Sequence, residues 1–452
     1  MASTFTRCCG SGETSTENGG QSVSMRGESK GETVLTWVTA KRLFLVLCWP
    51  LFSVLSPVGA IADDWPAYLG PHQNGISSET GLDLDWGEEG PPLVWRRRLG
   101  ESFSPPVVAQ GKLIAFHRLG NEEVVECLEA STGESLWNGR YGTNYVDRYQ
   151  YNGGPRSSPT IDGDRVYTYG AEGVLTCWEL QTGRQVWQRR LNEELGAPQE
   201  FFGVGTPPVV FRELLLLNPG GPNGAGMVGI DKRAGETVWK AGSCGAGYSA
   251  PVVATVAAQP MAFSLTKDGL LVLAPGTGRI LYDFPFRSPR RESVNAASPV
   301  VVGSRVLLSA AYEVGSVLLQ LEDGGLKTLW RDQEALQSHW ATSVFDQGNL
   351  YGLHGRHPRD AVMRCLDWET GRIKWTSPRL RERLTFIMAA GHFIAMGEYG
   401  HLIVFEVNPE RYVQTAKVRV LRSPCWAPPV LANGLLYVRN ETDLLCLDLR
   451  KE

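Results

Sequence analysis

The chain lacks an excess of charge of either sign, and it lacks an apolar run long enough to cross a membrane. Its 452 residues carry 44 basic and 48 acidic side chains, which gives a formal net charge of −4. Without a positive field, binding to nucleic acid or to an anionic membrane surface is not expected. The longest apolar stretch, residues 43–55, is shorter than the roughly 20 residues that a transmembrane helix needs. We therefore predict no membrane span in the mature chain.

Helix-favouring patterns are also scarce, whereas residues typical of turns and strands are abundant. The chain contains 51 Gly, 27 Pro and 14 Trp. Many glycines and prolines indicate many turns, and many tryptophans suit short strands that pack through large apolar faces. At 42% hydrophobic and 20% charged, the chain is too apolar to be disordered. A large folded protein rich in strands is predicted.

Residues 1–62 have the pattern of a disordered leader followed by a secretory signal peptide. A basic dipeptide at 41–42 precedes the apolar stretch 43–55, and Ala-Ile-Ala at 60–62 matches a cleavage site. We expect export to the periplasm, to another part of the cell envelope or to the outside, with a cut after Ala62. The leader is unusually long, so translation begins at either Met1 or Met25. The alternative is an uncleaved anchor, which the prolines at 50 and 57 disfavour.

A unit of about 44 to 54 residues recurs through the rest of the chain. Its end follows the pattern Ala/Cys-x-Asp/Glu-x-x-Thr-Gly-x-x-x-Trp. The clearest copies are residues 127–137, 177–187, 229–239 and 365–375, and weaker copies end at Tyr282, Trp330 and about Tyr412. Each unit predicts four short strands, named A to D, with the Thr-Gly turn between C and D. Four strands per unit of this length are typical of a propeller blade.

Eight such units predict an all-β, eight-bladed propeller over residues 92–450, after an N-terminal extension at 63–91. The predicted A strands start near residues 105, 159, 207, 251, 299, 342, 386 and 428. The last unit ends before any strand D, whereas residues 92–96, which include Trp95, read as a strand D without a blade. We expect this segment to complete the last blade, because closure removes the exposed sheet edges.

The cysteines follow the repeat. The chain has nine; of these, Cys127, Cys177, Cys365 and Cys446 share one strand-C position in different blades. Residues so placed should not approach within the roughly 7 Å that a disulfide requires, so we predict packing residues. Cys244 and Cys425 lie outside this register.

The repeat resembles the tryptophan-docking motif of eight-bladed quinoprotein propellers. That family includes the pyrroloquinoline-quinone (PQQ) alcohol dehydrogenases and the PQQ-like propeller of the outer-membrane assembly lipoprotein, and the likeness covers about residues 92–449. It implies that the repeat tryptophans dock neighbouring blades: Trp95, Trp137, Trp187, Trp239, Trp330 and Trp375. Blades four and seven depart from the pattern, with Tyr282 and Tyr412 near the docking position.

The resemblance to the dehydrogenases does not extend to their active site. It would imply a vicinal Cys pair beside the quinone, a calcium held by Glu and Asn or Asp, and a catalytic Asp. The only vicinal pair is Cys8-Cys9, upstream of the predicted cleavage site, and no segment supplies the calcium ligands. We predict no cofactor, no metal and no catalytic residue. A PQQ-dependent dehydrogenase with PQQ and calcium is the alternative.

One group of residues predicts a binding surface. In a propeller the D–A connections and the B–C loops share one face, here called the loop face, and the Thr-Gly turns lie on the other, the turn face. The candidate ligand-binding residues on the loop face are Tyr145, Arg148, Arg156, Tyr248, Asn295, Trp340, His354, Arg356 and Trp426. Aromatic rings with Arg side chains favour recognition of an envelope protein, a peptide or a small anion. The alternative is that they only satisfy loop backbones.

Other motifs are set aside. Residues 224–229 fit G-x-G-x-x-G, but the segment after them reads as a strand, whereas a dinucleotide site needs a helix there. His354 and His357 could bind a metal only if a third ligand such as His339 came near. We therefore expect an exported, non-catalytic binding or scaffold propeller, whose oligomeric state the sequence leaves open.

Overall fold

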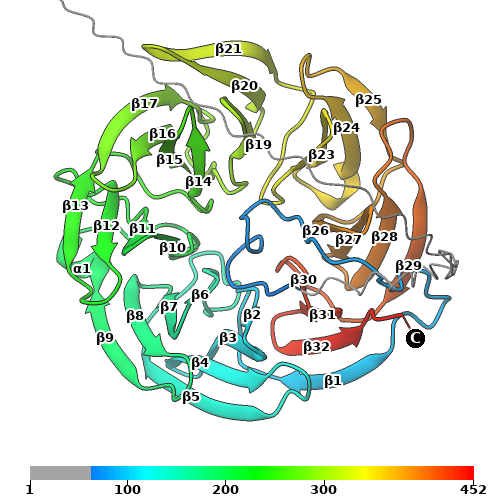
Figure 1. Cartoon of the computed structure of the whole chain (residues 1–452), viewed down its shortest axis with the longest axis horizontal. Coiled ribbons are helices and arrows are strands. Elements are labelled where there is room, and N and C mark those ends of the chain that lie inside the picture. Colours follow the sequence, from blue (N-terminus) through cyan, green and yellow to red (C-terminus); the bar gives the residue numbers. More distant parts are fainter. Residues whose placement is uncertain (1–62, 452) are drawn as a thin grey trace, which may run out of the picture. The chain divides into compact units, whose positions relative to one another are not determined.

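The computed structural model describes residues 63–451; the predicted signal peptide and the Cys8-Cys9 pair lie outside this range. Within it, 32 strands form eight four-stranded antiparallel sheets that follow one another around a ring (Figure 1). The predicted all-β, eight-bladed propeller is confirmed.

The first four blades follow directly in the chain. Blade one contains β2 (Val107–Ala109), β3 (Lys112–Leu119), β4 (Glu122–Glu129) and β5 (Ser135–Gly142). Blade two contains β6 (Thr160–Asp162), β7 (Arg165–Tyr169), β8 (Val174–Glu179) and β9 (Gln185–Arg190). Blade three contains β10 (Val209–Phe211), β11 (Leu214–Leu217), β12 (Met227–Asp231) and β13 (Thr237–Ala241). Blade four contains β14 (Val252–Val256), β15 (Gln259–Leu265), β16 (Gly269–Ala274) and β17 (Arg279–Pro285).

The second half repeats the pattern. Blade five contains β18 (Val300–Val302), β19 (Arg305–Ala310), β20 (Gly315–Glu322) and β21 (Gly325–Asp332). Blade six contains β22 (Val344–Asp346), β23 (Asn349–His354), β24 (Val362–Asp367) and β25 (Ile373–Thr376). Blade seven contains β26 (Leu384–Ala389), β27 (His392–Gly397), β28 (His401–Glu406) and β29 (Gln414–Arg419). Blade eight contains β30 (Val430–Ala432), β31 (Leu435–Arg439), β32 (Asp443–Asp448) and β1 (Leu93–Arg98).

The ring closes as predicted, because β1 is the outer strand of blade eight. It pairs antiparallel with β32, and Trp95 lies opposite Cys446. The other three strand-C cysteines also lie opposite the docking tryptophan of their own blade. All six cysteines of residues 63–451 are free. This confirms the prediction for the four strand-C cysteines, which lie in different blades.

The tryptophans dock neighbouring blades by the same contact each time. Each indole N–H donates to a backbone carbonyl at the C–D turn of the next blade, at 2.8–3.2 Å for Trp95, Trp137, Trp187, Trp239, Trp330 and Trp375. A β-bulge precedes each docking residue on strand D and turns its side chain toward the neighbouring blade.

The two departures from this pattern have different outcomes. Tyr282 keeps the docking contact, since its hydroxyl donates to the carbonyl of Glu322 at 3.3 Å. Tyr412 does not occupy the position: Ala416 pairs with Val404 there, and Tyr412 packs against Trp375 instead. Ala416 packs against an apolar cluster that contains Trp86 of the extension, so the extension covers this junction.

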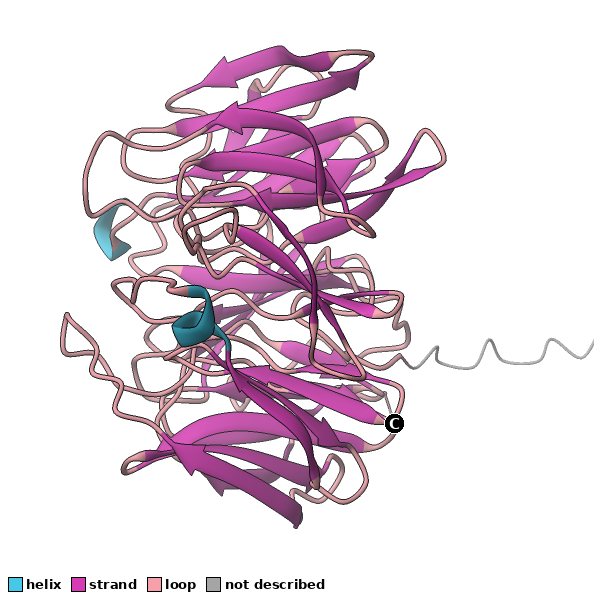
Figure 2. Ribbon diagram, turned by 90° about the vertical axis from the view of Figure 1, so that its left-hand side faces the viewer, coloured by secondary structure: helices cyan, strands magenta, loops and turns pink. Residues whose placement is uncertain are grey.

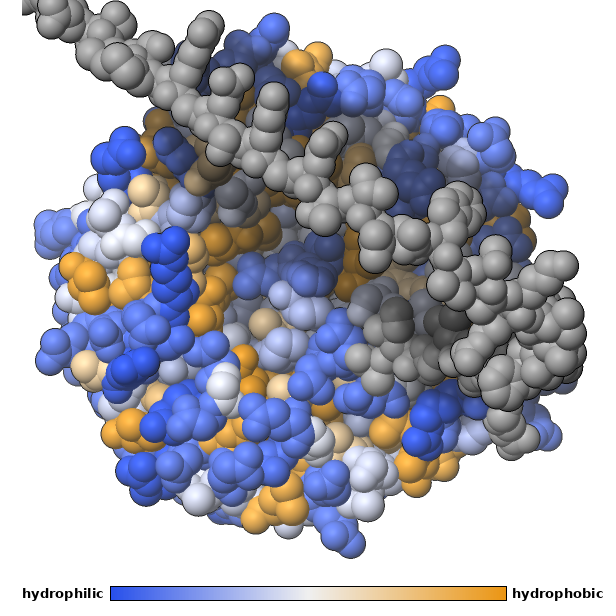
Figure 3. Space-filling model, viewed as in Figure 1, coloured by the Kyte–Doolittle hydropathy of each residue, from blue (hydrophilic) through white to orange (hydrophobic). Residues whose placement is uncertain are grey.

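The extension at 63–91 crosses the turn face of the ring (Figure 1, blue). Trp65 forms a β-bridge with Val108 of blade one, and Ile76 forms one with Met388 of blade seven. The Glu79 carboxylate accepts hydrogen bonds from two backbone amides at the A–B turn of blade eight. The extension therefore closes the ring's channel on this side. The visible part of this face carries hydrophilic residues with scattered apolar ones (Figure 3).

The two short helices mark the opposite side, the loop face. Helix α1 (Leu191–Leu195) lies in the D–A connection after β9, and the 3-10 helix η1 (Pro358–Asp360) lies in the B–C loop of blade six. Both lie on the same side of the sheets (Figure 2). Neither is long and apolar enough to span a membrane, and residues 63–451 contain no other helix.

Candidate functional site

A cavity of about 210 Å³ lies at the centre of the ring and is lined from the loop face. Half of the residues that line it come from one position of the repeat, four residues before the first residue of strand A in every blade except blade seven, where strand A begins earlier. In blade order that position holds Phe103, Arg156, Gly205, Tyr248, Ala296, Trp340, Arg383 and Trp426. All eight line the cavity. The repeat register thus brings distant segments together.

Hydrogen bonds between neighbouring blades fix these entry segments. The Ser157 hydroxyl donates to the Thr206 carbonyl at 3.0 Å, and the Ser298 amide donates to the Thr342 hydroxyl at 3.0 Å. Thr385 likewise donates to the carbonyl of Ala427 at 3.1 Å. Because these groups are buried and paired, the lining positions are held on a rigid frame.

Tyr68 of the extension also lines the cavity. Burial raises the pKa of its hydroxyl to about 12, so the side chain is neutral. Since the extension crosses the turn face, the cavity is blind and is reached only from the loop face. No repeat or motif in residues 63–91 indicates this role.

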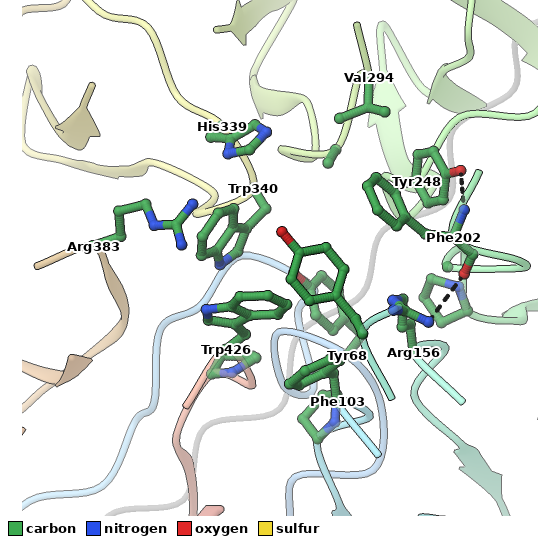
Figure 4. A pocket seen from close by; sticks show the side chains of 16 residues that line it. Tyr68, Phe103, Arg156, Phe202, Tyr248, Val294, His339, Trp340, Arg383 and Trp426 are labelled. Atoms are coloured by element: carbon green, nitrogen blue, oxygen red, sulfur yellow. Dashed lines mark hydrogen bonds between the residues drawn. The ribbon is translucent and has the colours of Figure 1, made fainter. Parts of the chain in front are cut away.

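The lining is predominantly aromatic, as Figure 4 shows. The rings of Trp340 and Trp426 lie 5.9 Å apart between centroids, and Phe103 lies 4.4 Å from Trp426. On the other side Phe202 packs edge-on against Tyr248 at 5.7 Å. Such rings offer a large apolar contact area at low cost in side-chain entropy.

Both arginines of the lining are engaged by buried carboxylates. Arg383 forms a salt bridge with Glu398, and its guanidinium lies 4.4 Å from the Trp340 ring. Arg156 bonds the fully buried carboxylate of Asp147 at 2.9 Å. The two pairs are each neutral overall, and their guanidinium groups are held against aromatic faces. From the sequence, aromatic rings with arginines on this face favoured recognition of a protein, a peptide or a small anion; the pairing of Arg156 with Asp147 was not predicted.

Two polar groups at the cavity remain without a partner among residues 63–451. The indole N–H of Trp340 and Nδ1 of His339 are buried and make no hydrogen bond. The other ring nitrogen of His339 lies 3.0 Å from the Tyr312 hydroxyl. Burial, with the nearby charge of Arg383, lowers the pKa of His339 to about 3, so this imidazole is neutral. His339 therefore adds no charge to the cavity wall.

The structure brings together four of the nine predicted site residues: Arg156, Tyr248, Trp340 and Trp426 line the cavity. The other five do not. Tyr145 is buried and bonds Asp147, and Arg148 lies over the Phe201 ring. Asn295 donates both amide hydrogens to backbone carbonyls.

The remaining two predicted residues lie outside the lining in blade six. His354 Nδ1 accepts from the amide of Gln337 and contacts the Arg364 guanidinium at 2.9 Å. Arg356 lies over the Tyr312 ring at 4.2 Å. These contacts match the alternative that loop residues satisfy the loops themselves.

Sequence reasoning missed Phe103, Phe202, Arg383 and Tyr68 as lining residues. Phe103 and Arg383 occupy the same repeat position as Trp340, so a register alignment of all eight entry segments would have identified them. Phe202 comes from the connection that follows α1, and Tyr68 comes from the extension. No repeat signal marks either of them.

The residues present do not fit the calcium site of a quinoprotein dehydrogenase. The cavity lining contains no carboxylate, and residues 63–451 contain no group of three His, Cys, Asp or Glu placed to hold a metal. His339, His354 and His357 form no such group either. The cavity is also smaller than the roughly 300–1,000 Å³ typical of cofactor and drug-sized ligand sites.

Comparison with known proteins gives concordant matches. The profile of the family described as outer membrane protein assembly factor BamB matches residues 120–377. The BamB of Burkholderia pseudomallei is 26% identical over 328 residues, covering 63% of this chain and 81% of that protein.

Solved structures agree in fold. BamB from Moraxella catarrhalis superposes with a TM-score of 0.58 at 15% identity, over 80% of this chain and all of that one. Quinohemoprotein alcohol dehydrogenase from Comamonas testosteroni gives 0.60 at 12% identity, over 86% of this chain and 81% of that one. These low identities show the shared propeller fold alone.

Proposed function

Because the chain belongs to the family of the outer membrane protein assembly factor BamB, we propose that it is a non-catalytic binding propeller that takes part in assembling outer-membrane proteins. It acts in the cell envelope after export, with its signal peptide cut after Ala62. Its partner is a polypeptide, which it binds at the loop face. It uses no cofactor and no metal.

The observation that carries this proposal is the aromatic cavity on the loop face, in a chain whose family is named for protein assembly. Aromatic side chains in a fixed, partly desolvated pocket are typical anchoring points for a protein partner. Exposed apolar side chains surround the opening, among them Tyr149 and Tyr151, which are 43% and 48% exposed. The loop face therefore offers both a pocket and a surface around it.

Site-specific photo-crosslinking in cells tests the proposal. A photoreactive residue at position 149 faces the solvent at the loop face, and one at Leu136 on β5, 46% exposed, is the matched control on the outer rim. We expect outer-membrane polypeptides to crosslink at position 149 and not at 136. Absence of crosslinks at 149, or equal crosslinks at both positions, overturns the proposal.

Reconstitution tests the dehydrogenase alternative. We expect the purified protein, mixed with PQQ and calcium, to show neither quinone absorbance after gel filtration nor calcium-dependent dye reduction. Dye reduction that needs both additions would replace the binding function with an oxidoreductase function.

A further inference from the structure

We infer that the central cavity holds one uncharged aromatic side chain of an extended polypeptide, whose backbone continues along the groove beside it. The inference rests on the proposed function and specifies the chemistry that the loop face recognises. Four observations support it: the size of the cavity, its charge, its unpaired donor and the adjoining groove.

The size of the cavity suits a single side chain. About 210 Å³ is too small for most whole ligands, whose sites hold roughly 300–1,000 Å³. The walls are the rings of Phe103, Phe202, Tyr248, Trp340 and Trp426. An aromatic ring entering between them would find edge-to-face and offset partners on several sides.

The charge of the cavity disfavours an ionic side chain. The guanidinium of Arg383 is paired with buried Glu398, and that of Arg156 is paired with buried Asp147. An anion would have to compete with these carboxylates for the same donors, and a cation would meet two guanidinium groups. Since desolvating an unpaired charge is costly, an uncharged anchor is the form that the cavity accepts.

The indole N–H of Trp340 is an unpaired hydrogen-bond donor at the cavity. It is buried and unpaired, and it can only donate. A peptide backbone places a carbonyl acceptor close to every side chain, so a bound segment can satisfy this donor. Leaving a buried donor unsatisfied is destabilising, which favours a partner that carries an acceptor.

A groove adjoins the cavity on the same face. Tyr151 lines both, and the groove runs from it past Val146 and Leu119. Val146 is 81% exposed and Leu119 is 49% exposed, so the groove presents apolar side chains to solvent. Its polar wall includes Arg98, Glu101 and Thr442. An extended chain anchored in the cavity would pass over this mixed surface, whose apolar side chains can contact its side chains and whose polar groups can hydrogen-bond to its backbone.

Binding of synthetic peptides by the full protein tests the inference. The probe is a capped, fluorescent heptapeptide of serine and threonine with phenylalanine at its centre, and the comparison peptides carry glutamate or lysine there. Fluorescence anisotropy should show the phenylalanine peptide binding about tenfold more tightly than either charged one. Equal affinities, or tighter binding of the glutamate peptide, overturn the inference; the second result would identify an anion site.

Two variants locate the binding. Trp426→Ala should weaken the phenylalanine peptide about tenfold or more. Trp340→Phe keeps a ring in the wall and removes the donor, so it should weaken the peptide several-fold without unfolding the blade. Tyr399→Ala is the matched control, because Tyr399 is 41% exposed in a B–C loop of the same face but does not line the cavity. Unchanged affinity in both tryptophan variants overturns the inference.

The peptide and crosslinking experiments test different proposals, so one can fail while the other succeeds. If crosslinks form at position 149 but the aromatic peptide is not preferred, the protein-binding function stands and the aromatic anchor is overturned. If the aromatic peptide is preferred but no crosslinks form, the aromatic anchor stands and the role in outer-membrane protein assembly is overturned.

Discussion

At the scale of single residues, the docking tryptophans depend on glycines in the neighbouring blade. Gly183 lies under the Trp137 ring, with φ of +71°, and a Cβ built on it would lie 2.5 Å from that ring. The turn at Gly163 in the same blade has φ of +57°, but nothing lies within 4 Å of its Cβ position. Comparing alanine substitutions at these two glycines therefore separates the free-energy cost of the left-handed backbone conformation from the cost of the close contact with the Trp137 ring.

We predict that Gly183→Ala destabilises the protein more than Gly163→Ala does. Both variants pay about 1–2 kcal/mol for an alanine in the left-handed region. Gly183→Ala should cost a further 1–3 kcal/mol or so, because the methyl group overpacks the interface between blades. Urea unfolding measures both, and equal midpoints would contradict the docking role of Gly183.

Glu123 is a second residue whose environment is set by the next blade. Its side chain is buried, and one carboxylate oxygen accepts from the Ala171 amide of blade two at 2.8 Å. Burial raises the pKa of this carboxyl to about 7, although the hydrogen bond from the Ala171 amide opposes the shift. The folded protein therefore keeps a proton here that the unfolded chain loses near pH 4.5.

The folded state should lose stability as the pH rises from about 4.5 to about 7, because in this range the unfolded chain releases the Glu123 proton while the folded protein retains it. The loss amounts to at most about 3 kcal/mol. We predict that Glu123→Gln is more stable than the natural protein at pH 8 and similar at pH 5. Melting temperatures at the two pH values test this. Glu122→Gln is the control: it changes a neighbouring exposed residue and should leave the pH dependence of the melting temperature unchanged. If Glu123→Gln also keeps the pH dependence of the natural protein, the Glu123 carboxyl is already ionised in the folded protein, contrary to the prediction.

At the scale of elements, the junction between the last blade and the first is held by a buried cation. Arg439, at the end of β31, is 2% exposed, and its guanidinium donates to backbone carbonyls of Gly100, Ser104, Asn440 and Glu441. Burial lowers its pKa to about 10, so it stays protonated at neutral pH. It thus ties the connection after β1 to the loop before β32.

We predict that Arg439→Met lowers the free energy of unfolding by about 2–4 kcal/mol, because several buried carbonyls lose their donor. Arg233→Met is the control, since its side chain is 81% exposed. Denaturant titration gives both values. A loss no greater than that of the control would mean that the closure does not depend on this guanidinium.

At the scale of the whole molecule, stability requires the first and last strands to meet. A chain that begins at residue 100 lacks β1 and exposes the edge of β32. We predict that it self-associates, because an unpaired edge strand pairs with other chains. A chain that begins at residue 92 keeps β1 and should elute from a sizing column like the intact protein, although its channel is open on the turn face. If the intact protein and the chains that begin at residues 92 and 100 all elute at the same volume, closure of the ring by β1 is contradicted.

The repeat determined most of what the sequence could reveal. Its period, its Thr-Gly turns and its tryptophans predicted eight blades, the closing strand around Trp95 and the free cysteines, because these features depend on local strand patterns that recur. Three of the cavity residues, Tyr248, Trp340 and Trp426, were found for the same reason, since they stand at one position of the repeat.

Only the tertiary structure decided what surrounds those residues. That Arg383 is paired with Glu398, that Asp147 holds Arg156, and that Tyr68 lies behind the cavity could not be read from the chain. Such contacts join loops and an extension that have no period, and their partners are set by the closing of the ring. The fold thus follows from repeated local patterns, whereas the charge and depth of the cavity follow from contacts between distant, unrepeated segments.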